Sequence, residues 1–220
     1  MRLDLHIHSS FSRDGTVSPR DVLRHCSKIG LAGCSVVDHN QIKGSLEASF
    51  YSRDEDLLVL RGVEVSSADG HVLAYGVSEL VPRGLPVAET IEKIHNLGGI
   101  AVAAHPVRFP SGVGLEVAEH ERFDAVEVLN GGSSGRGNKK ARRLAETKRM
   151  AMTAGSDAHK LLEIGKAYVE VEGVSTEDEL LDAIKLGLAR TGGRSRSASE
   201  GLAYSTETLI EWMRGSFRRL

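Results

Sequence analysis

Apolar segments of strand length alternate with amphipathic helical patterns along most of this 220-residue chain. The expected strands are Arg2–His8, Gly33–Asp38, Leu57–Val65, His71–Tyr75, Gly99–Ala104, Asp124–Leu129, Ala151–Ala154 and Lys166–Val171. The expected helices are Pro19–Ile29, Ser45–Tyr51, Val87–Leu97, Asn138–Lys148 and Thr176–Leu186. Such alternation favours parallel strands joined by crossover helices. No G-x-G-x-x-G motif follows the first strand, so a dinucleotide-binding fold has no support. About seven strand–helix steps suit a small barrel. We therefore expect an α/β fold, a distorted (β/α)7 TIM-like barrel.

The length of the chain fits a single domain. We expect residues 1–191 to form the barrel, and residues 192–203, which are rich in Gly, Ser and Arg, to form a linker. Residues 204–220 predict an amphipathic C-terminal helix, because Leu209, Met213, Phe217 and Leu220 recur at helical spacing. We expect this helix to pack on the barrel wall, with a dimer contact or a membrane-surface helix as the alternatives.

The overall composition excludes several classes of protein. A net charge of −2 argues against a globally basic nucleic-acid binder. No apolar run approaches the ~18 residues that span a bilayer, and the N-terminus lacks the basic and apolar regions of a signal peptide. Cys26 and Cys34 lack C-x-x-C spacing, so we expect two reduced thiols. These features predict a cytoplasmic protein without a membrane segment.

Histidine and acidic residues recur at the ends of the expected strands. His6 and His8 are two residues apart in one strand, so their side chains face the same side. Later strands end in Asp38-His39, in Glu64 and in His105, and another leads into Asp157-Ala158-His159. In (β/α) barrels these ends converge on one face. A carboxylate or imidazole that is buried there without a partner costs several kcal/mol, and a metal ion is the obvious partner.

The candidate metal ligands exceed what a single ion needs. Three protein ligands suffice for one catalytic zinc, so nine suit two or three metals. The nine are His6, His8, Asp14, His39, Glu64, His71, His105, Asp157 and His159. All of them offer nitrogen or oxygen, which suits Zn²⁺, Mn²⁺ or Fe²⁺ without choosing among them.

Other polar residues near these positions have structural interpretations. His25 lies on an expected helix, His95 lies near a helix end, and His120 lies in a polar segment expected to be a loop. His71 follows the turn pair Asp69-Gly70, so a surface histidine is its alternative interpretation. Asp38 precedes His39 directly and should face the other way, as a carboxylate that orients a ligating imidazole or stabilises the fold.

These residues lie in motifs that resemble those of the PHP (polymerase and histidinol phosphatase) superfamily, in order, from residue 3 to residue 172. The first motif is Asp4-Leu5-His6-Ile7-His8-Ser9, followed by Ser12-Arg13-Asp14-Gly15. The later motifs are Val37-Asp38-His39, Gly62-Val63-Glu64-Val65-Ser66, Ala104-His105-Pro106 and Gly155-Ser156-Asp157-Ala158-His159. Asn130-Gly131 and Asn138 are similar to the PHP-associated C-terminal segment.

The resemblance implies a distorted seven-stranded barrel that holds two or three divalent metal ions. It implies one metal on His6, His8, Glu64 and Asp157, a second on Glu64, His71 and His105, and a third on Asp14, His39 and His159. Asp14 stands where several members have histidine, a replacement seen in short phosphoesterases similar to the nucleoside 3′,5′-bisphosphate phosphatases. This chain lacks the large insertion common in that branch, so its substrate does not follow from the resemblance.

The metal set and the resemblance together predict hydrolysis of a phosphate ester. We expect a metal-bridging hydroxide to attack phosphorus, with Glu64, Asp157 and His159 as the catalytic residues. Arginine or lysine should bind the substrate phosphate. The candidates are Arg108, which follows His105 by three residues, Arg136 in the glycine-rich segment, Arg13 and Lys160.

The leading hypothesis is a metal-dependent phosphoesterase whose substrate is a small phosphomonoester, such as a nucleotide or a histidinol-phosphate-like molecule. The alternative is a 5′-3′ or 3′-5′ exonuclease that acts on single-stranded nucleic acid. Aromatic residues make up only 5% of the chain, and no basic stripe is evident at the site, which disfavours a nuclease. A metal-stabilised scaffold and an amidohydrolase-like deacylase are further alternatives. A deacylase normally needs a ligand lysine at a strand end, and none of the expected strands offers one.

Overall fold

The strands form two five-stranded sheets in the computed structural model, which describes residues 1–197 and residue 200. The first sheet has the order β10-β9-β1-β2-β3, and the second has the order β4-β5-β6-β7-β8. The first comprises β1 (Arg2–Ile7), β2 (Gly33–Val36), β3 (Leu58–Val59), β9 (Ala167–Glu170) and β10 (Arg190–Gly193). The second comprises β4 (Gly62–Ser66), β5 (His71–Tyr75), β6 (Ile100–Ala103), β7 (Ala125–Asn130) and β8 (Ala151–Gly155).

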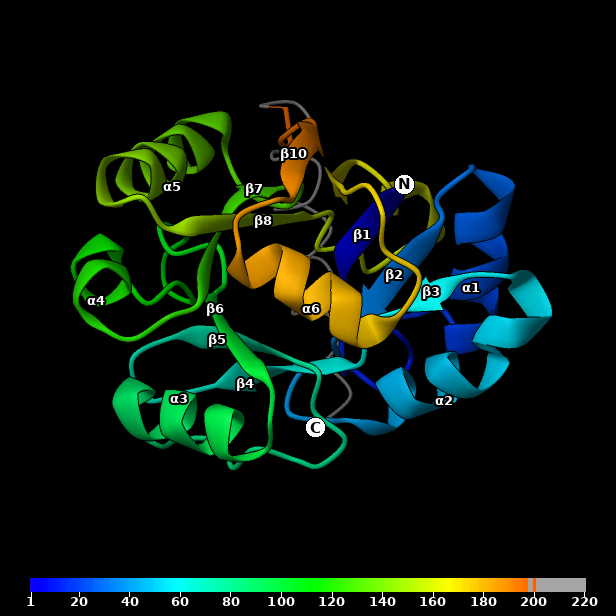
Figure 1. The fold of residues 1–220 in the computed structure, drawn as a ribbon, viewed down its shortest axis with the longest axis horizontal. Coiled ribbons are helices and arrows are strands. Elements are labelled where there is room, and N and C mark those ends of the chain that lie inside the picture. The colour runs from blue at the N-terminus through cyan, green and yellow to red at the C-terminus, as the bar shows by residue number, and fades with distance from the viewer. Residues whose placement is uncertain (198–199, 201–220) are drawn as a thin grey trace, which may run out of the picture.

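Helices surround these strands on the outside of the molecule (Figure 1). The α-helices are α1 (Pro19–Lys28), α2 (Lys43–Tyr51), α3 (Val87–Asn96), α4 (Leu115–His120), α5 (Gly135–Lys148) and α6 (Glu177–Lys185). Two short 3-10 helices, η1 (Ser52–Glu55) and η2 (Leu161–Glu163), complete the regular structure of the described residues. Figure 1 shows α1 and α2 on one side of the strands and α3, α4 and α5 on the other.

Backbone pairs and a buried hydrogen bond join the two sheets. Single parallel residue pairs join Ile7 to Ala158 and His39 to Glu64 across the gap between the sheets. In the interior, the buried Tyr75 hydroxyl of β5 donates a hydrogen bond of 2.7 Å to the Leu5 carbonyl oxygen of β1. The described fold is therefore mixed α/β, and its two sheets come together where several candidate ligands lie.

The prediction of one strand over Leu57–Val65 is wrong, because this segment forms two strands in different sheets. Its first part is β3, which pairs with β2, and its last part is β4, which pairs with β5 in the other sheet. Between them, the backbone N–H and the guanidinium of Arg61 both bind the Glu177 carboxylate at the start of α6. This anchor lies where the chain passes from the first sheet to the second, and Glu64 follows within the antiparallel pair of β4 and β5.

The expectation that the strands are parallel holds for only part of the fold. β1 and β2 are parallel, as are β6, β7 and β8, but β4-β5-β6 are antiparallel and β9 is antiparallel to both β1 and β10. The Asp69-Gly70 turn explains the β4–β5 pair, because a parallel connection needs a dozen or more residues. The short link can form only a hairpin, which Ser67 N–H closes by donating to the Gly70 carbonyl at 3.0 Å.

Side chains cap the starts of α1 and α6. Ser18 caps α1, since its side chain accepts the Asp21 N–H. Thr176, the first residue of the expected helix Thr176–Leu186, is the cap of α6, because Thr176 and Glu179 form a reciprocal capping box. The sequence did not predict α4, which ends at His120, or β10, which contains Gly192 and Gly193 from the expected linker.

Apolar packing leaves polar groups enclosed in the centre. Leu3, Leu5 and Ile7 of β1 are fully buried, and so is His6 between them. Cys26 and Cys34 are both buried and form no disulfide with each other. Within the described residues, no helix is both long and apolar enough to cross a membrane. The expected C-terminal helix, residues 204–220, lies outside the described part of the chain.

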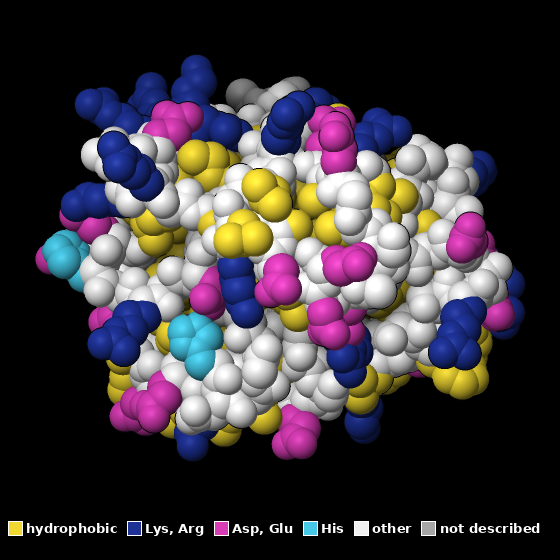
Figure 2. Space-filling model, viewed as in Figure 1, with side chains coloured by type: hydrophobic (Ala, Val, Ile, Leu, Met, Phe, Trp, Pro, Cys, Tyr) yellow, Lys and Arg dark blue, Asp and Glu magenta, His cyan; other side chains and the backbone are white. Residues whose placement is uncertain are grey.

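Basic side chains gather over α5 on the surface shown in Figure 2. The helix sequence contains Arg136, Lys139, Lys140 and Arg143, all exposed. The opposite side of the helix packs Ala141, Leu144 and Ala145 into the core. The amphipathic pattern therefore explains why this helix carries a cationic outer face.

Candidate metal centre

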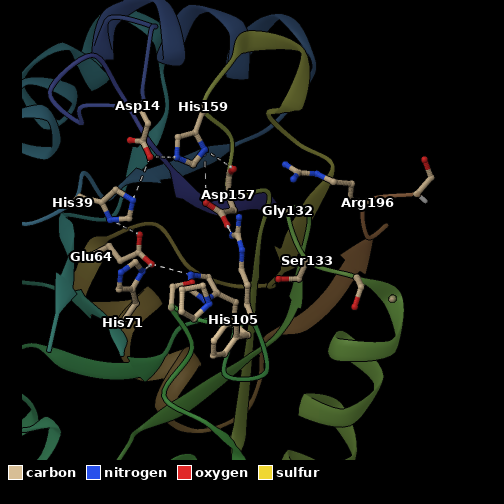
Figure 3. Close-up of a pocket in the computed structure, with 17 residues that line it drawn as sticks. Asp14, His39, Glu64, His71, His105, Gly132, Ser133, Asp157, His159 and Arg196 are labelled. Atoms are coloured by element: carbon tan, nitrogen blue, oxygen red, sulfur yellow. Dashed lines mark hydrogen bonds and ion pairs between the residues drawn. The ribbon is translucent and has the colours of Figure 1, made fainter. Parts of the chain in front are cut away.

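All nine candidate ligands gather around one cavity of about 700 Å³. His6 lies in β1, Glu64 lies in β4 and His71 begins β5, whereas the others follow strand ends or, like Asp14, lie in the loop after β1. Figure 3 shows how the side chains that line the cavity point toward one another. Those that line the cavity are Asp14, His39, Glu64, His71, His105, Asp157 and His159. His6 and His8 are buried behind them.

The Glu64 carboxylate lies at the centre of the cluster and is fully buried. Its Oε1 atom lies 2.9 Å from His71 Nδ1 and 3.0 Å from His105 Nε2. His71 therefore belongs to the cluster, which contradicts its alternative interpretation as a surface histidine.

The other oxygen of Glu64 faces a second group of imidazoles. Glu64 Oε2 lies 3.0 Å from His39 Nδ1, 3.3 Å from His8 Nε2 and 3.4 Å from His6 Nε2. One carboxylate thus places its two oxygens against two different sets of nitrogen donors. That arrangement suits a carboxylate shared between two cations.

Asp157 completes the group around His6 and His8. Its Oδ1 atom lies 3.3 Å from His8 Nε2 and 3.7 Å from His6 Nε2. Its Oδ2 atom accepts hydrogen bonds from Arg108 and, at 3.3 Å, from Asn130 Nδ2. The Asp157 backbone has a φ of 55° and donates to the His6 carbonyl at 2.7 Å, which ties the turn after β8 directly to β1.

Asp14 and His159 lie at the open edge of the cavity. Asp14 Oδ2 lies 3.2 Å from His159 Nε2 and 3.7 Å from His39 Nε2, but its side chain is 50% exposed.

The cluster contains compact groups of three possible metal ligands. Two of these groups are His8 with His39 and His159, and His6 with His8 and Asp157. Glu64 groups with His6 and His105, and also with His39 and His71. His6, His8 and His39 each belong to two of these groups, whereas the family resemblance assigns each of them to a single metal ion.

Several buried nitrogen and oxygen atoms of this cluster lie close to one another but make no hydrogen bond with the described residues. They include the Nε2 atoms of His6, His8 and His159, Nδ1 of His39 and Oε2 of Glu64. Buried polar atoms are normally satisfied. A set of unpartnered imidazole nitrogens and a carboxylate oxygen that converge on one space fits a divalent metal ion.

The electrostatics of the cluster favour positive charge. Burial acts to lower the pKa of His6, but the charges of Glu127, Glu64 and Asp157 raise that pKa well above its ordinary value. Burial acts to raise the pKa of Glu64, but the His6 charge and the hydrogen bond from His105 hold that pKa well below its ordinary value. Nearby opposite charges explain both shifts. Divalent cations would satisfy the same field.

Glu127 is a site residue that sequence reasoning missed. It is buried in β7, where it accepts a hydrogen bond from His6 Nδ1 at 2.9 Å and one from the His105 N–H at 2.8 Å. The first bond leaves His6 Nε2 turned toward Glu64 and Asp157. The available signal was an acidic residue inside the otherwise apolar segment from Ala125 to Leu129.

Asp38 is connected through Ser12 to His8 rather than to the side chain of its neighbour His39. The Ser12 hydroxyl donates to Asp38 Oδ1 at 2.9 Å and lies 3.2 Å from His8 Nδ1. Asp4, on the histidine face of β1, instead binds backbone N–H groups of Ser156 and Gly165, both at 2.8 Å. Burial raises the Asp4 pKa to about 6.

Of the four expected phosphate-binding residues, Arg108 alone lines the cavity. Arg13, Arg136 and Lys160 are exposed and are not among its lining residues. Arg196 does line it, and sequence reasoning missed this residue because it lies in the segment expected to be a linker. His25, His95 and His120 are also absent from the cavity lining, in agreement with their structural interpretation.

We expect Glu127→Gln to weaken metal binding about 10- to 100-fold, because partners that orient a ligating histidine typically contribute that much. The measurement is the metal dissociation constant, obtained by competition with a chelator. Glu170→Gln, at an exposed position of β9, is the matched control. Equal affinities for the two variants would contradict the orienting role of Glu127.

Comparison with known proteins agrees with the motifs. A family model described as PHP-associated matches residues 135–188. An uncharacterised protein of Methanocaldococcus jannaschii is 32% identical over 141 residues, which cover 59% of this chain and 82% of that relative. A second protein of the same organism is 28% identical over 186 residues, which cover 80% of this chain and 73% of that relative.

Solved structures share the fold at low sequence identity. A two-domain protein of Bacteroides vulgatus, described as containing a predicted PHP-like metal-dependent phosphoesterase, has a TM-score of 0.74 at 17% identity over 88% of this chain. This chain spans 65% of that protein. A protein of Bifidobacterium adolescentis that is described as a metal-dependent phosphoesterase has a TM-score of 0.64 at 19% identity, covering 84% of this chain and 96% of that one. An amidohydrolase of Chromobacterium violaceum, with bound sulfate and no metal, has the same TM-score and the same identity. The match covers 82% of this chain and 96% of that one.

Proposed function

We propose that this chain is a member of the PHP superfamily and a metal-dependent phosphoesterase that hydrolyses a phosphomonoester of a small molecule. A PHP-associated family model matches its residues 135–188. A nucleotide and a histidinol-phosphate-like molecule are the substrates we favour. The observation that carries the proposal is the buried Glu64 carboxylate, whose two oxygens face two separate sets of histidines. A cavity of about 700 Å³ above it suits a small ligand.

The chain offers donors for two or three divalent ions, and we favour Zn²⁺, Mn²⁺ or Fe²⁺. His6, His8, Glu64 and Asp157 would hold one ion, and Glu64 would share a second with His71 and His105. Bound ions would supply charge for the phosphoryl oxygens and would acidify water. The third set, which joins Asp14 to His39 and His159, has a half-exposed carboxylate and should hold its ion least firmly.

Protein groups orient the substrate in this proposal. Arg108 lies at the cavity wall with its guanidinium on Asp157, so it can bind a phosphoryl oxygen while it holds that carboxylate in place. The buried Glu127 fixes the orientation of His6 and so supports the floor of the site. The three expected catalytic residues, Glu64, Asp157 and His159, act as metal ligands in this proposal.

The two sheets would form the distorted barrel of the superfamily. The residue pairs Ile7–Ala158 and His39–Glu64 support this proposal, because they join the sheets at both sides of the site. They also place the ends of β1 and β2 close to β4 and to the turn after β8. Such convergence explains how residues far apart in the sequence reach one cavity.

A nuclease is the second candidate, and one observation favours it. The exposed basic side chains of α5 extend from Arg143 to Arg136 near the amino end of that helix, where Gly135 lines the cavity. A cationic surface next to a hydrolytic site could guide a polyanionic strand. The candidate requires an oligonucleotide substrate rather than a small monoester.

The test is a metal count on the purified protein, combined with hydrolysis rates on nucleoside monophosphates, nucleoside 3′,5′-bisphosphates, histidinol phosphate and short oligonucleotides. We expect at least two ions per chain, loss of activity on chelation, and kcat/KM for the best small monoester at least about tenfold above that for any oligonucleotide. The reverse preference would favour the nuclease. A protein that retained no metal and hydrolysed no phosphate ester would contradict both candidates.

A further inference from the structure

The cavity has a second polar wall that faces the metal-ligand cluster. Ser133, Ser134, Gly135 and Arg196 line this wall, which joins the end of β7 and the start of α5 to the segment after β10. Figure 3 shows the Ser133 hydroxyl and the Arg196 guanidinium directed toward the acidic and histidine side chains. The nine candidate ligands do not include any of these residues.

The Ser133 hydroxyl is buried and makes no hydrogen bond with the described residues. The residue is 8% exposed, and its Oγ atom has no hydrogen-bond partner among the described residues. The backbone around it is satisfied, because its N–H donates to the Asn130 carbonyl at 3.2 Å and its carbonyl accepts from the Arg196 N–H at 3.2 Å. A buried hydroxyl that borders a cavity is therefore poised to bind a polar ligand.

The same wall contains the amino end of α5, a helix of 14 residues. Its first residue, Gly135, lines the cavity, and its cap, Ser134, accepts the Gly137 N–H. The first N–H groups of a helix lack partners within the helix, and its dipole favours negative charge there. The Ser133 hydroxyl and this helix end thus offer hydrogen-bond donors on one wall.

Arg196 adds a fixed positive charge. Its side chain is 13% exposed, and its guanidinium Nη2 lies 3.9 Å from Glu163 Oε1. Glu163 is itself held by the His159 N–H, which donates to Oε2 at 2.9 Å. A backbone pair between Ser134 and Arg196 fixes the segment against the start of α5. The guanidinium is therefore positioned by two parts of the site rather than extended into solvent.

We propose that Ser133, the amino end of α5 and Arg196 form a phosphate-binding subsite across the cavity from the metal ligands. A hydroxyl, helix N–H groups and a guanidinium form the donor set that binds tetrahedral oxyanions. The subsite holds the substrate phosphate from the side opposite Glu64 and Asp157. This inference deepens the proposed phosphoesterase function and rests on it.

Inorganic phosphate is the probe that tests the subsite. The measurement is its dissociation constant on the metal-loaded protein by titration calorimetry, with metal content checked for each variant. We expect Arg196→Gln to bind phosphate about 10- to 100-fold more weakly, and Ser133→Ala several-fold more weakly, because hydrogen bonds to charged groups contribute that much. Arg196→Lys should recover part of the loss, since it keeps the charge without the two-pronged geometry.

Arg194→Gln is the matched control, because Arg194 lies in the same segment, is 57% exposed and pairs with Glu200. It should bind phosphate as the unmodified protein does. Equal phosphate affinity in Arg196→Gln, Arg194→Gln and the unmodified chain would overturn the subsite. If Arg196→Gln does not fold, phosphate binding unchanged in both Ser133→Ala and Arg196→Lys overturns it equally.

Hydrolysis distinguishes this inference from the function on which it rests. In an active enzyme, loss of a contact made in both the bound substrate and the transition state should raise KM more than it lowers kcat. An inactive protein whose phosphate binding depends on Arg196 would retain the subsite and contradict the phosphoesterase. An active protein whose phosphate affinity and KM are unchanged in Arg196→Gln would retain the phosphoesterase and contradict the subsite.

Discussion

Glu64→Gln is expected to reduce phosphomonoesterase activity by at least about a thousandfold and to lower the metal content of the purified protein. The amide keeps the shape of the side chain but removes the charge and one acceptor oxygen. Both Glu64 oxygens face imidazoles, at 2.9 to 3.4 Å, so the change affects both sides of the centre. Metal ions contribute several kcal/mol to transition-state stabilisation, and each 1.36 kcal/mol is about tenfold in rate.

Metal analysis and steady-state kinetics test this expectation on the same preparation. Glu92→Gln, at an exposed position of α3, makes the same chemical change far from the cavity and should leave both quantities unaltered. Full activity and full metal content in Glu64→Gln would show that the carboxylate does not bridge two ions.

Gly155→Ala is expected to destabilise the protein by about 1–3 kcal/mol or more and to disturb metal binding at the same time. A Cβ atom at Gly155 would lie 2.2 Å from His6 Cβ and 2.5 Å from the His6 backbone nitrogen. These atoms belong to the central strand β1, so they cannot move aside as a flexible side chain would. The substitution should therefore push apart β1 and β8 and displace the His6 imidazole.

Thermal unfolding and metal content measure the two parts of this effect. Gly98→Ala is a useful control, because open space surrounds that position while its φ of 78° imposes a backbone cost of roughly 1–2 kcal/mol. We expect the control to lower the melting temperature without loss of metal. If Gly155→Ala retained full metal content, the close approach of β8 to His6 would not be what positions this ligand.

The candidate metal ligands could be recognised in the sequence because they have a local signature. His6 and His8 share a strand face, and Glu64, His105 and Asp157 lie at or just after the ends of expected strands, where a buried charge would otherwise be costly. Each of these positions can be recognised within a few residues of sequence. Their convergence was expected from the alternation of strands and helices, and the structure places all nine around one cavity.

Residues with no local signature were missed. Glu127 resembles any single polar residue in a strand, and its function depends on His6, which is 121 residues away in the sequence. Arg196 lies in a Gly- and Ser-rich segment that is typical of a linker, yet its backbone pairs with Ser134 beside the cavity. These contacts between distant segments cannot be read from spacing or periodicity.

The sequence by itself determined the donor chemistry and the local elements, because side-chain type, strand alternation and helix caps depend on neighbouring residues. The tertiary structure alone decided how the strands pair, where the chain leaves one sheet for the other, and which donors face which oxygen of Glu64. Those features depend on packing and hydrogen bonds between segments far apart in the chain, such as the anchor of Arg61 on Glu177. Local patterns do not encode such contacts, so the alternation that predicted parallel strands could not reveal the antiparallel β4–β5 hairpin that carries Glu64 and His71.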